Sequence, residues 1–269
     1  MSAETERLTA SKIMNMKRKG IKIVALTAYD ATFARLEDEA GVDLILVGDS
    51  LGMVIQGHEN TIPVTLEDVI YHTRACSRSV KRALVVADMP FMSYQASVEQ
   101  ALINAGRCLK EGGAHTVKLE GGEEIAETIR RLVNTGIPVM GHIGMQPQMV
   151  NIYGGYRLQG RKTNDAEQII RDAEAIQGAG AFSIVLEKIP SELAAEITKR
   201  LKIPTVGIAA GPDCDGQILV NYDLFGLADQ FNFKFVRRYL ELARDIREAV
   251  TKWGDDIRNG SFPNAEESF

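Results

Sequence analysis

Asp43-Leu44-Ile45-Leu46-Val47-Gly48-Asp49-Ser50 is the stretch that decides the fold of this 269-residue chain. Five of the six residues after Gly41 are apolar, and the run then ends abruptly at an acid and a hydroxyl group. A short apolar run bounded by turn residues is typical of a β-strand that is buried on both faces. Asp49 and Ser50 follow at its carboxyl end, which is where ligands bind in parallel α/β proteins. Taken alone, Asp49 fits a cap of the following turn equally well.

The same pattern recurs along the chain, and this repetition favours a ligand-binding role for Asp49 over a turn cap. Four further apolar runs each end at a titratable side chain: 83–87 at Asp88, 115–119 at Glu120, 137–141 at His142 and 182–186 at Glu187. Because four of the five runs end in carboxylates, the pattern predicts one shared polar site at the strand ends.

The order of the elements favours a parallel sheet. Strand and helix patterns alternate seven or eight times, which predicts an α/β protein with a single (β/α)8 TIM barrel over residues 1–269. An open doubly wound sheet is the alternative, but no strand is followed by a convincing G-x-G-x-x-G motif. At the ends we expect a lead-in helix within 1–20 and an irregular tail over 258–269. Residues 222–226 fit a short eighth strand or a turn, and 234–253 are expected to be helical.

Composition excludes several classes of function. The formal net charge is −5 and no basic patch stands out, so nucleic acid is not an expected partner. No apolar run approaches the roughly 18 residues that span a membrane. The three cysteines are scattered and odd in number, which fits a reducing compartment and predicts a cytoplasmic protein.

The residue types at the strand ends suit a divalent cation. Asp49, Asp88 and Glu120 offer the oxygen ligands that Mg²⁺ prefers, and Mg²⁺ needs only one or two protein carboxylates directly. Such an ion can hold an α-keto acid and polarise its carbonyl group. Lys118 projects to the same side of its strand as Glu120, because side chains alternate along a strand, and it would bind a substrate carboxylate.

Glu187 lies on a strand further round the barrel, where it is a candidate general base. Together these groups predict proton abstraction next to a metal-bound carbonyl, which yields an enolate. His142 is compatible with a ligand, a base or a hydrogen-bond partner, and the sequence assigns none of these. The alternative is an interior polar network without catalysis, although buried carboxylates are costly unless they are paired or bound to metal.

At these positions the chain closely resembles the ketopantoate hydroxymethyltransferase family. The matching segments run in order from about residue 10 to 225: LTAYD (26–30), VGDSLGM (47–53), QGH (56–58), PVT (63–65), DMPFM (88–92), VKLEGG (117–122), GHIG (141–144), GGYRLQGR (154–161) and DGQ (215–217). The chain departs from the family's pattern at Met145-Gln146, 209–211 and 221–222, and none of these is an expected metal or base position.

The resemblance implies a barrel with a Mg²⁺ site at Asp49, Asp88 and Glu120. It implies that 3-methyl-2-oxobutanoate is bound by Asp49, Ser50, Asp88 and Lys118, and that Glu187 accepts the proton. The family transfers a hydroxymethyl group from 5,10-methylenetetrahydrofolate to the enolate carbon, giving 2-dehydropantoate in pantothenate biosynthesis. Its members are homo-oligomers, often decamers.

Two other functions stay open at this point. One is a C–C lyase or mutase of the phosphoenolpyruvate mutase and isocitrate lyase type, although the Lys-Lys-Cys-Gly-His motif of isocitrate lyase is absent. The other is a barrel that binds a keto acid as a sensor without turnover. The presence of metal ligands, a lysine and a base together counts against a sensor.

Overall fold

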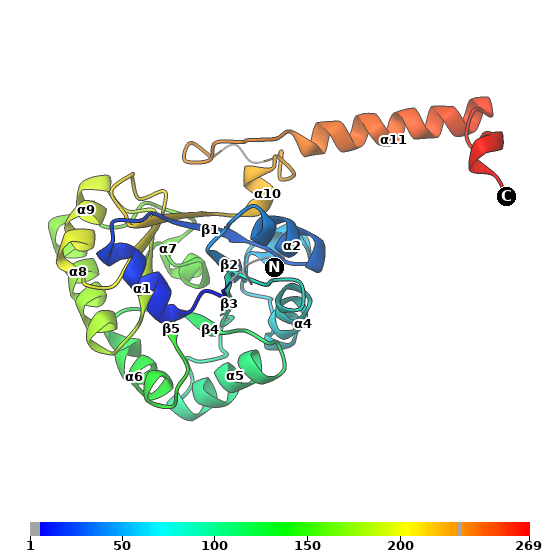
Figure 1. The fold of residues 1–269 in the computed structure, drawn as a ribbon. Coiled ribbons are helices and arrows are strands. Elements are labelled where there is room, and N and C mark those ends of the chain that lie inside the picture. Colours follow the sequence, from blue (N-terminus) through cyan, green and yellow to red (C-terminus); the bar gives the residue numbers. More distant parts are fainter. Residues whose placement is uncertain (1–5, 231–232) are drawn as a thin grey trace. The chain divides into compact units, whose positions relative to one another are not determined.

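The apolar run quoted above forms β2 (Leu44–Val47), in which every residue is buried. The computed structural model describes residues 6–230 and 233–269, and in these residues eight parallel strands pair in chain order (Figure 1). β8 also pairs with β1, with Ala25 opposite Ile218, so the sheet closes into a barrel. The predicted (β/α)8 fold is confirmed. The other strands are β1 (Ile23–Thr27), β3 (Leu84–Asp88), β4 (Thr116–Glu120), β5 (Val139–Gly144), β6 (Ser183–Glu187), β7 (Thr205–Ile208) and β8 (Gly216–Leu219).

The interior of the barrel is filled by every second residue of several strands. One buried cluster contains the pairs Ile23 and Ala25, Leu44 and Leu46, and Leu84 and Val86, together with Met140, Val185, Val206 and Ile218. Side chains alternate between the two faces of a strand, so the next inward positions on β3, β5 and β6 are Asp88, His142 and Glu187. The polar side chains thus continue the apolar interior toward the carboxyl ends of the strands.

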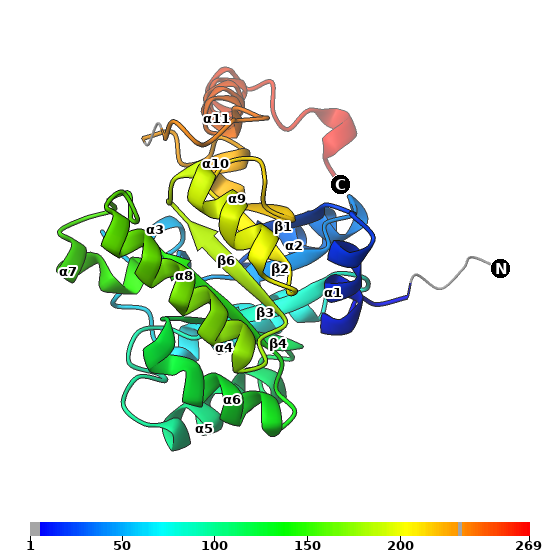
Figure 2. The same cartoon turned by 90° about the vertical axis from the view of Figure 1, so that its left-hand side faces the viewer.

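Helices surround the barrel unit (Figure 1, Figure 2), and three of them begin with a side-chain cap. α4 begins with a capping box, in which Thr65 and Asp68 each accept from the other's main-chain N–H. The side chains of Asp30 and Ser97 cap α2 and α5 by accepting from main-chain N–H groups of the first turn. β7 and β8 are joined by residues 209–215 without a helix. The helices after the strands are α2 (Ala31–Glu39), α3 (Leu51–Val54), α4 (Leu66–Ser77), α5 (Val98–Lys110), α6 (Ala126–Asn134), α7 (Val150–Tyr153), α8 (Thr163–Gly178) and α9 (Ser191–Arg200).

The lead-in helix α1 (Ala10–Arg18) closes the amino-terminal end of the barrel. Ile13 is fully buried in the interior cluster. Lys17 forms an ion pair with Asp215 just before β8, at 2.7 Å, and also donates to the carbonyl of Thr198. The predicted helix within 1–20 is therefore present, and residues 1–5 of that prediction lie outside the described residues.

A second compact unit begins after Leu219. Residues 222–226, expected to form a short strand or a turn, instead contain most of the short helix α10 (Asn221–Leu224). Only 225–226 form a turn, which ends at Gly226, where φ is +67°. The eighth strand lies earlier, at Gly216–Leu219. α10 ends as Phe225 donates its main-chain N–H to Asn221 O.

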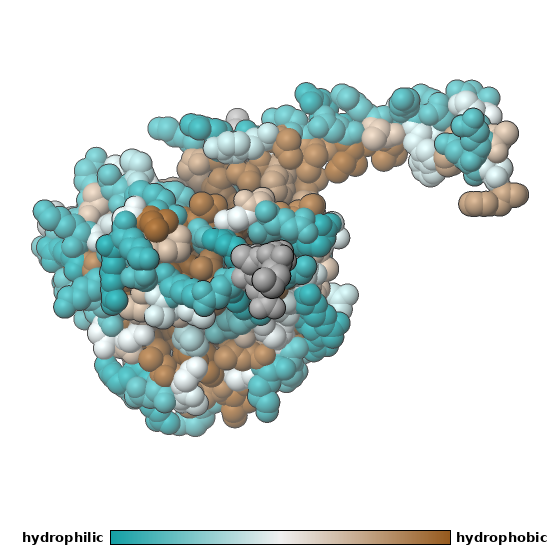
Figure 3. All heavy atoms as spheres, in the orientation of Figure 1, coloured by the Kyte–Doolittle hydropathy of each residue, from teal (hydrophilic) through white to brown (hydrophobic). Residues whose placement is uncertain are grey.

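The long helix of this unit starts later than predicted. It is α11 (Leu242–Asn259), so the prediction of a helix over 234–253 is wrong at both ends. The N–H groups of Tyr239, Leu242 and Ala243 donate to carbonyls of residues 224–226, so this stretch follows the preceding turn rather than a helical path. Apolar side chains gather along one side of α11 (Figure 3): Ile246, Val250, Trp253 and Ile257.

Residues 258–269, predicted to be irregular, contain the end of α11 and a short 3₁₀ turn, Ala265–Glu267, which Asn264 caps. Among the helices of the described residues, none has the length and apolarity needed to cross a membrane.

Candidate active site

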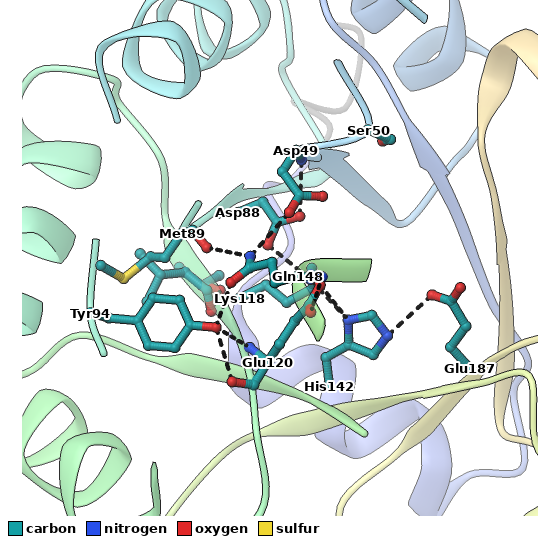
Figure 4. A network of polar contacts seen from close by, with 12 residues as sticks. Asp49, Ser50, Asp88, Met89, Tyr94, Lys118, Glu120, His142, Gln148 and Glu187 are labelled. Carbon is teal, nitrogen blue, oxygen red and sulfur yellow. Dashed lines mark hydrogen bonds and ion pairs between the residues drawn. The ribbon is translucent and has the colours of Figure 1, made fainter. Parts of the chain in front are cut away.

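The titratable side chains predicted from the strand ends lie together at the carboxyl-terminal end of the barrel (Figure 4). The strand register makes them lateral neighbours. Asp88 on β3 lies opposite Lys118 on β4, and Glu120 on β4 lies opposite His142 on β5. All four are buried. Asp49, two residues beyond β2, is also buried and donates its main-chain N–H to Oδ2 of Asp88 at 3.0 Å.

Lys118 is the cation inside this cluster. Its Nζ lies 2.8 Å from Oδ1 of Asp88 and 3.6 Å from Oε1 of Glu120. Burial by itself lowers the pKa of Lys118, but the charges of Asp88, Glu120 and Asp49 outweigh burial and raise that pKa above its usual range. The lysine is therefore protonated at neutral pH.

The three carboxyl groups respond differently to burial. Burial raises the pKa of Asp49 well above its usual range, and the charges of Asp88 and Glu120 raise it further. Burial also raises the pKa of Asp88, although Lys118 opposes the shift. For Glu120 burial acts in the same direction, but Lys118 and His142 outweigh it and lower the pKa. The site holds more carboxylate charge than Lys118 compensates, which favours a further cation.

Each of these carboxylates has one oxygen fixed by a main-chain or amide N–H donor. Oδ2 of Asp88 accepts from Asp49 N, Oε2 of Glu120 accepts from Gln148 N, and Oδ2 of Asp49 accepts from Gln148 Nε2, each at 3.0 Å. Oδ1 of Asp88 and Oε1 of Glu120 are buried without a well-aligned hydrogen bond and face the ammonium of Lys118 as ion pairs. These are the oxygens that would face a bound cation.

A Mg²⁺ ion fits the chemistry of this donor set, because Mg²⁺ takes oxygen ligands and keeps several waters. Across residues 6–230 and 233–269, no three His, Cys, Asp or Glu side chains are arranged to hold a metal ion by themselves. In the same place the ammonium of Lys118 lies between Asp88 and Glu120. The residues therefore suit an ion completed by water and substrate, and not a closed cage of protein ligands.

His142 connects the carboxylate cluster to Glu187. Its Nδ1 lies 3.0 Å from Nζ of Lys118, and its Nε2 lies 3.2 Å from Oε2 of Glu187. Burial and Lys118 lower the pKa of His142, but Glu120 and Glu187 outweigh them and raise it to about 9. Because the lysine can only donate, a neutral ring carries its proton on Nε2. In both protonation states Nε2–H therefore points to Glu187, whose side chain is 20% exposed.

Ser50, the remaining predicted substrate ligand, lies at the edge of the cluster. Its Oγ is 2.8 Å from Oη of Tyr29, a fully buried residue. Nδ1 of His72 in turn contacts the main-chain oxygen of Tyr29 at 2.6 Å. The structure thus brings Asp49, Asp88, Lys118 and Glu120 into direct contact, links Glu187 to them through His142, and places Ser50 beside Asp49 on the rim.

Two buried residues of the site were not predicted from the sequence, Tyr94 and Gln148. Tyr94 Oη accepts from Glu120 N, and it donates toward Glu120 O and Gln148 Oε1, both at 2.9 Å. Gln148 lies after β5, in the 3₁₀ turn Pro147–Met149. Neither is charged, and neither ends a strand, so the pattern of strand-end carboxylates gave no indication of them.

The stretch between β5 and α8 forms a cover beside the site. It includes a 3₁₀ turn (Pro147–Met149) and α7 before α8 begins at Thr163. Lys188, directly after Glu187, donates from Nζ to Tyr156 O at 2.5 Å, and Tyr156 Oη contacts Sδ of Met53 at 3.4 Å. These contacts fasten the cover beside Glu187.

Solved structures with this fold come from a group of small-acid enzymes. Phosphonopyruvate hydrolase, crystallised in complex with oxalate and Mg²⁺, has a TM-score of 0.63 and 15% identity, over 97% of this chain and 93% of that chain. 2,3-Dimethylmalate lyase, described as a member of the PEP mutase/isocitrate lyase superfamily, has a TM-score of 0.62 and 17% identity, over 93% and 89% of the two chains. At these identities the likeness shows the fold alone.

Sequence relatives are much closer. The 3-methyl-2-oxobutanoate hydroxymethyltransferase of Pelobacter propionicus is 55% identical over 269 residues, covering 100% of both chains. The enzyme of the same name from Moorella thermoacetica is 52% identical over 267 residues and 99% of both chains. The family model described as ketopantoate hydroxymethyltransferase matches residues 7–265. This chain is thus a transferase enzyme, and it belongs to the ketopantoate hydroxymethyltransferase family.

Proposed function

We propose that this enzyme transfers a hydroxymethyl group from 5,10-methylenetetrahydrofolate to 3-methyl-2-oxobutanoate in a Mg²⁺-dependent reaction. The product is 2-dehydropantoate, an intermediate of pantothenate biosynthesis. The observation that supports this most is the pairing of a buried carboxylate cluster around Lys118 with a separate, partly exposed Glu187. The first suits a metal and an acidic substrate, and the second suits a base.

Asp49, Asp88 and Glu120 are the residues that would hold Mg²⁺. When bound, the ion would act as a Lewis acid that polarises the keto group of the substrate.

Lys118, Asp49, Ser50 and Asp88 would bind the substrate. The ammonium of Lys118 is fixed by Asp88 at 2.8 Å and lies in a buried environment, where its attraction to a substrate carboxylate is stronger than in water. Ser50 is held by Tyr29, so its hydroxyl offers a hydrogen bond beside Asp49.

Glu187 would accept the proton from C3 of the substrate. The C–H electron pair then forms the enolate, whose C3 bonds to the methylene carbon of the folate. Both C–N bonds to that carbon break, one water supplies the hydroxyl group, and tetrahydrofolate leaves after taking up the released protons. The ion-pair contact between His142 Nε2 and Oε2 of Glu187 at 3.2 Å orients the carboxylate and leaves its remaining lone pairs for the proton.

Proton NMR of 3-methyl-2-oxobutanoate in D₂O tests this proposal. With enzyme and Mg²⁺ we expect the C3 proton to exchange, and with 5,10-methylenetetrahydrofolate we expect a new hydroxymethyl signal. In Glu187→Gln the rates of C3 proton exchange and of product formation should each fall by roughly 100-fold or more, because general base catalysis supplies about 10²–10⁴ in rate. Asp49→Ala and Asp88→Ala should require more Mg²⁺.

Several outcomes would contradict the proposal. Undiminished exchange by Glu187→Gln would exclude that residue as the base. Exchange without any product would favour a lyase or mutase activity or a different one-carbon donor, and binding without exchange would favour a sensor.

We further propose that the enzyme is a cytoplasmic homo-oligomer, with a decamer as the expected state. Three free, buried cysteines fit a reducing compartment. The apolar side of α11 contributes no buried residue in the single chain, which fits burial against further copies. Light scattering should give ten copies of the 29.5 kDa chain, about 295 kDa, and a monomer at micromolar concentration would contradict this.

A further inference from the structure

Gln148 lies at the centre of the carboxylate cluster, although it carries no charge (Figure 4). Its side-chain Nε2 donates to Oδ2 of Asp49 at 3.0 Å and to the carbonyl of Met89 at 2.9 Å. Its main-chain N–H donates to Oε2 of Glu120 at 3.0 Å. One residue thus contacts the ends of three other strands, since Asp49 follows β2, Met89 follows β3 and Glu120 ends β4.

The orientation of the Gln148 amide is determined by its surroundings. Both groups near Nε2, the Asp49 carboxylate and the Met89 carbonyl, are acceptors, so the NH₂ group must face them. On the other side, Oε1 receives Gln95 Nε2 at 3.0 Å and Tyr94 Oη at 2.9 Å. Both donors and both acceptor positions of the amide are therefore used, and a flipped amide would place oxygen against oxygen.

A neutral donor has a particular effect on a metal-binding carboxylate. An amide N–H fixes the direction of a carboxylate without cancelling its charge, whereas a lysine or arginine would compete with the metal for that charge. Hydrogen bonds of this kind orient metal ligands and strongly influence metal affinity. Gln148 supplies them to two carboxylates on different strands.

We propose that Gln148 is a positioning residue for the metal site, which sets the separation and direction of the Asp49 and Glu120 carboxylates for one divalent cation. This inference rests on the proposed function. The side chain fixes Asp49, and the main-chain N–H, which only a proline would remove, fixes Glu120. Side-chain variants therefore isolate the Asp49 contact.

The test uses two variants and Mn²⁺, whose free concentration is measured by electron paramagnetic resonance. Gln148→Met has nearly the same shape but removes both donors. Gln148→Asn keeps an amide that is one methylene shorter and cannot reach Asp49 and Tyr94 together. Both should bind Mn²⁺ about 10–100-fold more weakly than wild type, the usual cost of removing a partner of a metal ligand. Turnover should recover largely at high Mg²⁺, because the loss is in metal affinity.

Gln95→Leu is the matched control. Gln95 is exposed and contacts the same amide on its other side, without touching Asp49. We expect this variant to keep wild-type Mn²⁺ affinity. If Gln148→Met does not fold, the Mn²⁺ affinity of Gln148→Asn tests the inference by itself.

The outcomes separate this inference from the function on which it rests. If wild type binds Mn²⁺ and exchanges the C3 proton, but a folded Gln148 variant binds Mn²⁺ equally well, the positioning role is wrong and the proposed function stands. If wild type neither binds Mn²⁺ nor shows Mg²⁺-dependent exchange, both are wrong. A loss of thermal stability with unchanged Mn²⁺ affinity would show a merely structural role and also overturn the inference.

Discussion

Lys118 is almost completely enclosed, and its ammonium is the buried positive charge that compensates Asp88 and Glu120. Lys118→Met should therefore lower the free energy of unfolding by about 3–5 kcal/mol without divalent cation, because it leaves buried carboxylates unpaired. Mg²⁺ should restore part of this loss by binding the folded state. Urea titrations with and without Mg²⁺ measure both effects.

Lys22→Met serves as a control, since it removes an exposed lysine whose ammonium donates to the carbonyl of Cys214 and, within the described residues, pairs with no buried carboxylate. A Lys118→Met protein as stable as wild type in the absence of metal would show that the carboxylates are compensated in another way.

His115, at the amino end of β4, gives a pH dependence away from the site. Its Nδ1 accepts from Val85 N at 3.1 Å, and its Nε2 faces the Arg7 guanidinium at 2.7 Å. Burial and Arg7 lower the pKa of His115. The unfolded chain thus binds this proton more tightly, and stability is lost as pH falls through the unfolded-state value of about 6.5.

We therefore expect His115→Asn to flatten the dependence of unfolding free energy on pH between about pH 7.5 and pH 5. The measurement is a urea midpoint at each pH. An equally steep decline in the variant would assign the dependence to other groups.

The sequence indicated the charged residues of the site well, and its neutral ones poorly. Asp88, Glu120 and Glu187 each end an apolar strand, and His142 follows an apolar run within β5, so their clustering could be predicted from the order of residues in the sequence. Gln148 and Tyr94 depend on how loops after different strands meet. The contact between these loops arises only in the closed barrel, and no local sequence pattern encodes it.

At the scale of elements, the end of β5 is packed directly against the end of β6. Gly144 has φ of +92°, and a Cβ there would lie 2.3 Å from the carbonyl oxygen of Glu187. Gly144→Ala should cost about 1–3 kcal/mol of stability through overpacking. It should also lower turnover by roughly 10–100-fold, because a shift of about 1 Å in the base is enough for such a loss. Steady-state kinetics and thermal unfolding test the two effects.

Gly136 offers a matched control. It has a similar φ of +95°, but nothing lies within 4 Å of its Cβ position. Gly136→Ala should cost only the backbone strain, about 1 kcal/mol, and leave turnover unchanged. Equal losses of turnover in both variants would refute the explanation through Glu187.

Element boundaries were predicted best where the local pattern is strong. β2 (Leu44–Val47) lies within the predicted apolar run that ends before Asp49. β8 was missed because Gly216–Leu219 has four residues and includes the exposed Gln217. α11 begins eight residues late because hydrogen bonds to residues 224–226 hold Tyr239 and Leu242, and such contacts do not show in helical periodicity.

At the scale of the barrel unit, the interior is closed at one end by α1. Ile13 is fully buried there. Ile13→Ala should lower the free energy of unfolding by about 2–5 kcal/mol, whereas Ile21→Ala, at a half-exposed position, should change it by less than about 0.5 kcal/mol. Turnover of the folded variants should match wild type, since the site lies at the other end. A cost below 1 kcal/mol for Ile13→Ala would show that α1 packs loosely.

Closure of β1 onto β8 has a consequence for synthesis on the ribosome. At about 5–20 residues per second, α1 and β1 emerge many seconds before the strand that completes the ring. Until Leu219 is available, β1 keeps an unpaired edge and the apolar interior stays open to water. Lys17 likewise lacks its ion-pair partner until Asp215 has been synthesised. The first helix to be made is thus among the last to reach its final surroundings, and the nascent chain passes through a long aggregation-sensitive interval.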